Sequence, residues 1–199
     1  MRLLQSVLSC LHQTKKPQGK LITHWLGVLL MLPGHATFRH MSRYSPYHER
    51  TFDRRYDTPF DSVSFNKITL TEGGPSEHEQ ALVIDASFIP KSGKPTDGLG
   101  RFWNGSHRRT EKGLDISTLA WLDLTGNCAY CLSVEQTPAS ADAYHAETTR
   151  MALYLDPLSR VVNAHDLSFL RDGITDGAYR KQTFVTAVLE LEMHQMGKR

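Results

Sequence analysis

The sequence is poor in cysteine and has no long apolar run. Its three cysteines, Cys10, Cys128 and Cys131, are an odd number without the spacing of a disulfide framework, which favours a reducing compartment. The longest apolar run, Trp25–Leu32, is far too short to span a bilayer, and residues 1–11 lack a convincing signal-peptide cleavage site. We therefore expect a soluble, cytoplasmic and nucleoid-associated protein with no membrane partner.

Internal repeats and low-complexity tracts are also absent, and 40% apolar with 9% aromatic residues are enough to build a core. The charge is unevenly distributed. Residues 1–55 contain nine Lys/Arg and two Asp/Glu, whereas residues 56–80 contain one lysine and five Asp/Glu. This split predicts a polyanion-binding N-terminal region, with an ordinary solvated face as the alternative.

The basic N-terminal region, residues 1–72, is expected to be helical. Leu21–Leu32 has apolar residues on nearly every face, which predicts a helix buried among other helices, and it is ended by Pro33-Gly34. Ala36–Tyr44 follows, and Ser45-Pro46 opens a helix to about Tyr56. A tight turn and a basic last helix resemble a helix-turn-helix, in which that helix would contact DNA. A plain helical cap on the next domain is the alternative. The arginines that would contact DNA are Arg50, Arg54 and Arg55.

A further helix, from Thr58 to about Leu70, and a linker, residues 71–80, precede a larger domain, residues 80–199. The elements expected there are strand 81–89, a glycine-rich basic loop 91–105, strands 114–124 and 128–134, a helix from 141 to about 154 that continues toward 163 after Asp156-Pro157, a strand ending near 175 and a helix over 179–189. This order predicts a mixed α/β sheet with flanking helices, whose fourth strand returns parallel beside the first.

Two aspartates are the candidate site of this sheet. Asp85 interrupts an apolar strand, where an ionised carboxylate is costly unless it is compensated. Asp176 stands at the expected C-terminal end of the neighbouring strand. Such a pair suits hard divalent cations, and two cations about 3.5–4 Å apart can activate the attacking oxygen and stabilise the leaving oxygen of a phosphodiester. The alternative is a hydrogen-bonded Asp85 and an ordinary Asp176-Gly177 turn.

Several sequence blocks resemble one family. Val83–Lys94, continued by residues 98–105, resembles the first-aspartate block of DDE-type insertion-sequence transposases, which have an RNase H-like catalytic fold. Similarity to this family continues, in the same order, in residues 42–45, 49–52, 112–117, 132–138, 175–181 and 184–185. The resemblance spans roughly Leu30 to Lys198.

The resemblance implies metal-dependent phosphoryl transfer on double-stranded DNA, with transposon ends and target DNA as partners and self-association of the chain left open. Asp85 and Asp176 would be the first two ligands of Mg²⁺ or Mn²⁺, and Asp172 is the less favoured substitute for Asp176. Basic side chains in loops near the site would contact phosphates, although each could instead be a solvated surface charge. They are Lys91, Lys94, Arg108, Arg109 and Lys112.

The third acid of this family lies on a helix beyond the strand that Leu191–Met196 resembles, and the sequence ends at Arg199. Glu190 and Glu192 lie in or beside that strand region, so neither is assigned the role. We therefore expect a C-terminally truncated transposase fragment that is inactive alone. The alternatives are a non-catalytic DNA-binding or regulatory protein derived from a transposase, and an active nuclease with an unrecognised third acid.

Overall fold

The computed structural model of the chain forms two compact units, Met1–Gly73 (unit 1) and Gly74–Arg199 (unit 2). The structure describes residues 2–11, 14–73, 79–93, 96–137, 150–165, 167, 169–176, 179 and 181–197. None of the helices among these residues combines the length and the apolar character that crossing a bilayer requires.

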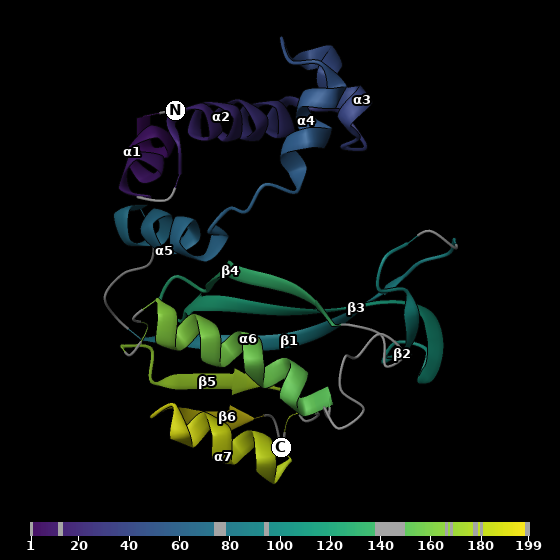
Figure 1. Ribbon diagram of the computed structural model, residues 1–199. Helices are drawn as coiled ribbons and strands as arrows, with labels where there is room; N and C mark the ends of the chain where they lie inside the picture. The colour runs from purple at the N-terminus through teal and green to yellow at the C-terminus, as the bar shows by residue number, and fades with distance from the viewer. Residues whose placement is uncertain are drawn as a thin grey trace. The chain divides into compact units, whose positions relative to one another are not determined.

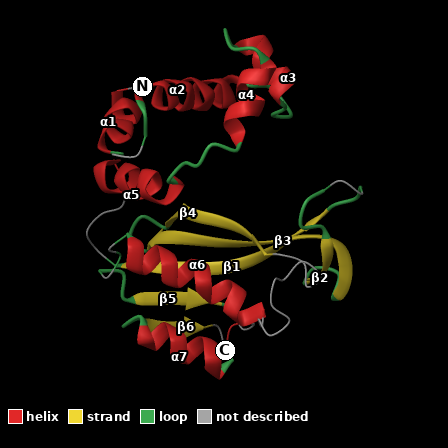
Figure 2. Ribbon diagram, viewed as in Figure 1, coloured by secondary structure: helices red, strands yellow, loops and turns green. Residues whose placement is uncertain are grey.

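Unit 1 is helical, as expected (Figure 2). Its small core is built from residues on three helices, where Leu21 and Val28 pack with Met41 and Phe52, and the Trp25 ring lies 5.6 Å from the Phe52 ring. The elements are α1 (Arg2–Cys10), α2 (Lys16–Met31), α3 (Phe38–Met41), the 3-10 helix η1 (Ser42–Tyr44), α4 (Glu49–Tyr56) and α5 (Ser62–Gly73).

The starts of the last two helices differ from the prediction. Ser45 does not open α4, because its hydroxyl accepts the Tyr47 amide at 3.0 Å and lies 2.8 Å from the His24 ring nitrogen, so it closes a turn instead. Likewise α5 is capped by Asp61, whose carboxylate accepts the Ser64 amide at 2.9 Å, and not by Thr58. The capping residue of α5 is therefore Asp61, three positions after the predicted start at Thr58.

Two further expectations for unit 1 were wrong. Residues 71–73, predicted as the start of a linker, form the last turn of α5. The helix α2 is not buried on all sides, since Leu30 is 89% exposed and Met31 is 66% exposed. Its apolar residues exceed what the small core of this unit can cover.

Unit 2 contains one six-stranded sheet. The strands are β1 (Gln80–Pro90), β2 (Gly100–Asn104), β3 (Arg109–Asp123), β4 (Cys128–Thr137), β5 (Asp172–Thr175) and β6 (His194–Gly197). β1 pairs antiparallel with β3, and β4 pairs antiparallel with the other edge of β3. β5 pairs parallel with β1, and β6 pairs parallel with β5.

The resulting strand order, β4-β3-β1-β5-β6, is that of an RNase H-like mixed sheet. Four strands, β1 to β4, come first and pair antiparallel, and two helical crossovers then add β5 and β6 in turn, both parallel to β1 (Figure 1). The crossover helices are α6 (Arg150–Ala164) and α7 (Gln182–Glu190). The predicted fold class is therefore confirmed.

Both crossover helices cover the same face of the sheet (Figure 1). Leu158 of α6 and Phe184 and Val188 of α7 pack there against Leu82 and Ile84 of β1. Burial along β3 alternates strictly from Gly113 to Asp123, so its other side chains, which are half-buried, point to the opposite face. The central strand β3 therefore has one buried face, covered by the helices, and one accessible face.

The two crossover helices also correct the prediction. Pro157 lies inside α6 and does not interrupt it, while residues 141–149, where that helix was expected to start, lie outside the described residues. Tyr179 precedes α7, which begins at Gln182. Within α7, Phe184 and Val188 are buried, whereas Leu189 is 56% exposed.

The glycine-rich segment 91–105, predicted as a loop, contains the strand β2. It pairs antiparallel with the first part of β3, from Gly100 opposite Gly113 to Asn104 opposite Arg109. Its alternating burial follows the strand period, since Phe102 and Asn104 are buried whereas Arg101 and Trp103 are exposed. This alternation is difficult to detect in the sequence, because β2 is only five residues long and the stretch Lys91–Gly100 has the composition of a loop.

The junction of β1, β2 and β3 leaves no room for a side chain at Gly113. A Cβ atom there would overlap the Ile89 carbonyl oxygen and the Phe88 ring. We expect Gly113→Ala to lower the free energy of unfolding of unit 2 by about 1–3 kcal/mol, because a backbone atom cannot move aside. Urea denaturation followed by circular dichroism would measure it. Gly105→Ala is the matched control, since no atom lies within 4 Å of its Cβ position, and equal stability of the two variants would contradict the prediction.

Candidate functional site

The structure brings Asp85 and Asp176 together on adjacent parallel strands. Ile84 pairs with Thr175, the last residue of β5, in the β1–β5 ladder. Asp85 follows Ile84 in β1 and Asp176 comes directly after β5, so the two aspartates follow the last pair of a ladder whose strands lie about 4.8 Å apart. Ile84 and Thr175 are buried on the face covered by the helices, whereas both aspartates are exposed. By the alternation of strands, the two carboxylates share the accessible face.

The electrostatics of Asp85 reflect this arrangement. Partial burial raises the pKa of Asp85 above its ordinary value, the negative charge of Asp176 raises it further, and a hydrogen bond from the Ala86 amide opposes both effects. Proximity of two like charges is costly unless a cation lies between them. Two oxygen ligands with mutual repulsion therefore fit a hard divalent cation.

The turn that holds Asp176 is fixed by Gln195 of β6. The Gln195 side-chain amide donates to the Thr175 hydroxyl at 2.9 Å and to the Tyr179 carbonyl at 3.2 Å, one residue before and three residues after Asp176. The Tyr179 amide in turn donates to the Asp176 carbonyl at 3.3 Å. This bridge restricts the backbone on both sides of the carboxylate. Gln195 was not identified from the sequence, which gives no signal for it.

Tyr179 anchors the same turn in the core. Its side chain is 2% exposed, and its ring lies 5.0 Å from the Phe184 ring and 5.4 Å from the Tyr154 ring. Burial first, then Tyr154 and Asp85, raise the pKa of Tyr179 above its ordinary value. The phenol therefore stays neutral beside the two carboxylates.

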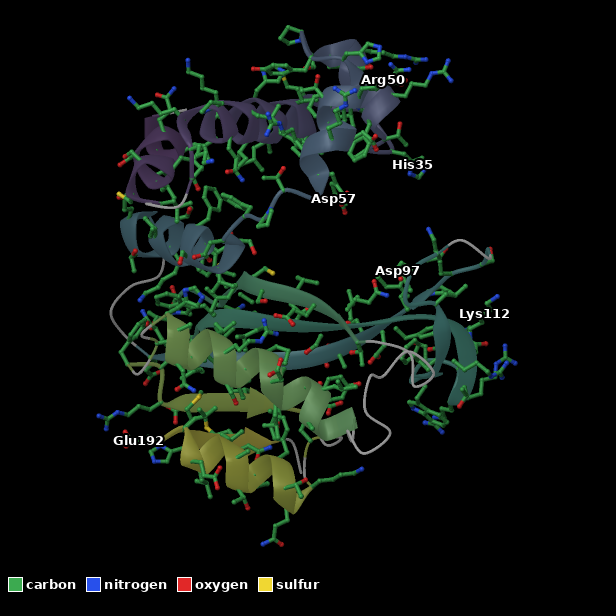
Figure 3. The ribbon with its side chains drawn as sticks, in the orientation of Figure 1. His35, Arg50, Asp57, Asp97, Lys112 and Glu192 are labelled. Atoms are coloured by element: carbon green, nitrogen blue, oxygen red, sulfur yellow. The ribbon has the colours of Figure 1, made fainter. Side chains whose placement is uncertain are left out.

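The other acids near the end of the chain lie away from this pair. Asp172 pairs with His194 at the start of β5, at the opposite end of that strand from Asp176. Glu192, in the turn before β6, lies on that side as well, and Figure 3 shows it at the far end of unit 2 from Lys112. Within the described residues, no group of three His, Cys, Asp or Glu side chains could hold a metal ion. Among the described residues, the candidate metal site therefore consists of two carboxylates, those of Asp85 and Asp176.

Three of the basic residues predicted to contact phosphates line one hollow at the end of the sheet. Its volume is about 770 Å³, and Figure 3 shows Lys112 at this end. Lys91, Arg109 and Lys112 line it together with Arg101, a residue that the sequence analysis did not select. Arg108 lies in the turn between β2 and β3, and Lys94 lies outside the described residues.

A hydrogen-bonded network around Glu111 organises this turn. The Asn104 side-chain amide donates to one Glu111 oxygen at 2.6 Å, the His107 ring nitrogen lies 2.9 Å from the same oxygen, and the Arg109 guanidinium donates to the other at 2.6 Å. These contacts, that of Asn104 first, lower the pKa of Glu111 to about 2. Glu111 is therefore ionised at any physiological pH.

The predicted DNA-binding helix is α4 of unit 1. Arg50, Arg54 and Arg55 are all exposed on it. Phe52 is fully buried, and Arg50 and Arg54, two residues to either side of it, lie on the opposite face of the helix. Residues 1–73 contain ten Lys/Arg and five Asp/Glu. The arginines are accessible, and their contact with DNA stays a prediction.

The raised pKa of Asp85 has a consequence for stability. Between the unfolded value near 3.8 and the raised folded value, the unfolded chain releases its proton first, so stability falls as the pH rises through this window. We expect Asp85→Asn to melt at a higher temperature than the unmodified chain at neutral pH without metal, and at the same temperature below that window. Thermal unfolding in chelator would test it, and equal melting temperatures at neutral pH would count against it.

Comparisons with known proteins give limited information. No protein-family model and no curated protein sequence matches the chain. A solved structure described as the crystal structure of a pre-cleavage Mos1 transpososome is similar at a TM-score of 0.30 and 11% sequence identity, over 85% of this chain and 57% of that chain. The chain thus spans little more than half of that chain's length, and a likeness at this level carries no argument about activity.

Proposed function

We propose that this chain is part of a DDE-type transposase, an enzyme of DNA transposition that cleaves and joins DNA strands by metal-dependent phosphoryl transfer. One observation carries the proposal. Asp85 and Asp176 follow the buried pair Ile84 and Thr175 on adjacent parallel strands, exposed on the accessible face of an RNase H-like sheet. The sequence blocks around both aspartates, which resemble that family, support it independently.

The residues of this chain would bind and orient a divalent cation, Mg²⁺ or Mn²⁺, at this face. The carboxylates supply hard oxygen ligands, and the Gln195 bridge between Thr175 and Tyr179 keeps Asp176 in place. The bound cation would stabilise the attacking and leaving oxygens of a phosphodiester. Because Asp85 and Asp176 contribute two of the family's three acids, we expect the 199-residue chain alone to bind metal weakly and to cleave DNA little or not at all.

Calorimetric titration of the metal-free chain with Mn²⁺ would test the metal site. We expect Asp85→Ala and Asp176→Ala each to lower the affinity at least tenfold, since each removes half of the carboxylate ligands. Asp172→Ala is the matched control, because this acid lies at the other end of β5 and should leave the affinity unchanged. Unchanged Mn²⁺ binding by Asp85→Ala would exclude this residue as a ligand.

A second candidate function is a non-catalytic DNA-binding or regulatory protein derived from a transposase. The exposed arginines of α4, in a unit with ten Lys/Arg and five Asp/Glu, favour DNA binding by unit 1. In this case the sheet of unit 2 would be a scaffold, and the two aspartates would be remnants of an ancestral site.

A salt series of DNA binding would test the role of α4. We expect changing Arg54 and Arg55 together to alanine to reduce the slope of log affinity against log salt by about 1 to 2, because about one counterion is released per phosphate contact. Changing Lys16 and Lys20 of α2, an equal loss of charge within unit 1, is the control for net charge. A slope unaffected by the arginine changes would show that this helix does not touch phosphates.

A further inference from the structure

The hairpin formed by β2 and the start of β3, residues 100–113, is a cationic element in an acidic unit. Residues 74–199 contain 13 Lys/Arg and 16 Asp/Glu, a formal charge of −3. The hairpin alone contains four Lys/Arg and one acid, Glu111, a charge of +3. The rest of the unit therefore has a charge of −6, and the positive charge is concentrated in 14 residues.

The hairpin extends past the end of β1. Pro90, the last residue of β1, pairs with Gly113, so residues 109–112 of β3 continue beyond it with β2 as their paired strand. Four residues at about 3.3 Å each extend about 13 Å, and paired strands lie about 4.8 Å apart. The major groove of B-DNA is about 12 Å wide and about 8.5 Å deep and admits a two-stranded β-ribbon. A ribbon of two paired strands therefore fits into the groove, and an extension of about 13 Å is long enough for its tip to reach the groove floor.

The tip of the hairpin is ordered by its own side chains. The Asn104 side-chain oxygen Oδ1 accepts the backbone amides of Ser106 and His107 at 3.0 and 3.4 Å, and the Asn104 side-chain nitrogen and the Arg109 guanidinium donate to Glu111. Glu111 therefore neutralises Arg109 and fixes the turn. Arg108 lies in the turn between Asn104 and Arg109, and its φ of 50° is in the left-handed region. Its side chain is exposed and extends from a turn whose backbone the Asn104 and Glu111 contacts hold in place.

The ribbon has one face that combines charge and apolar surface. Arg101 pairs with Lys112, and Trp103 pairs with Thr110, so these four residues point to the same side. The Trp103 side chain is 54% exposed. The Arg101 guanidinium donates to the Thr110 carbonyl at 3.2 Å, which holds it along the ribbon. Cations beside an open aromatic ring suit a sugar-phosphate backbone with thymine methyl groups within reach.

We propose that this hairpin enters the major groove of duplex DNA as a β-ribbon, with Arg108 contacting base edges and Arg101 and Lys112 contacting phosphates. This inference rests on the proposed DNA function and specifies how unit 2 binds its substrate. An acidic protein partner would match the charge of the hairpin, but the fit of the ribbon to the groove favours duplex DNA.

Binding of the full 199-residue chain to a short fluorescent duplex, followed by anisotropy, tests the contacts. Arg108→Ala weakens binding about tenfold, because a base-edge contact by arginine is lost, and Arg101→Ala reduces the salt slope by about 1. Arg171→Ala, an equal loss of charge just before β5, is the matched control and changes affinity less than twofold. Equal binding by the unmodified chain and Arg108→Ala overturns the proposal.

Two further measurements separate groove entry from attraction by charge. A duplex whose cytosines bear glucosylated hydroxymethyl groups has a filled major groove with the same phosphates, and binding to it weakens at least tenfold. Glu111→Ala raises the charge of the hairpin to +4 yet weakens binding, because the tip loses its order. Equal binding to the filled duplex, preference for single-stranded DNA, or tighter binding by Glu111→Ala would overturn the proposal.

The two proposals fail separately. If Asp85→Ala loses Mn²⁺ affinity while Arg108→Ala binds DNA as tightly as the unmodified chain, the metal site is supported and groove binding by the hairpin is excluded. If Arg108→Ala loses DNA affinity while Asp85→Ala binds Mn²⁺ as tightly as the unmodified chain, groove binding by the hairpin is supported and the proposed metal-dependent function is excluded.

Discussion

The parallel pairing of β1 with β5 is the constraint on which the candidate site depends. Sequence separates Asp85 from Asp176 by more than half of unit 2, and only this ladder, with Ile84 beside Thr175, brings the two carboxylates to one level. The pairing requires α6 to cross from β4 over the sheet, and Leu158 and Val161 of α6 are buried there. Without that crossover the two aspartates would be isolated surface charges.

The two faces of the sheet have different roles. One face is covered by α6 and α7 and provides the hydrophobic stabilisation of the unit through residues such as Leu82, Phe184 and Val188. The accessible face holds the carboxylate pair, where partial burial and then the negative charge of Asp176 raise the pKa of Asp85. The raised pKa marks a group that destabilises the metal-free fold and that a cation would stabilise. The packing of the helix-covered face therefore holds the two mutually repelling carboxylates together on the accessible face.

The hairpin illustrates the same division between order and charge. Glu111, the one acid in the hairpin, is committed to Asn104, His107 and Arg109, so the remaining cations are presented from a fixed backbone. An unordered loop of the same composition would lose conformational entropy on binding a polyanion. Because the turn is already ordered in the folded chain, binding a ligand does not require a further loss of conformational entropy there.

The sequence by itself predicted the type of most elements and both aspartates of the candidate site, Asp85 from its strand context and Asp176 mainly from the resemblance. Local propensity and periodicity agree with the final structure in the strand around Asp85, the strand that begins at Cys128 and the helix before Pro33, so the sequence predicts these elements. The helix starts at Ser45 and Thr58 and the break at Pro157 were misread, since the Tyr47 amide, the Asp61 cap and the packing of α6 overrode local signals.

Only the tertiary structure decided which distant residues meet. The strand β2 is too short to show its period in the sequence, and it becomes a strand because β3 continues past β1 and offers a paired edge. Gln195 lies 19 residues after Asp176 in the sequence, yet it bridges Thr175 and Tyr179 because β6 pairs with β5. Such contacts depend on strand register, which local sequence does not encode and which the packing of one buried face fixes.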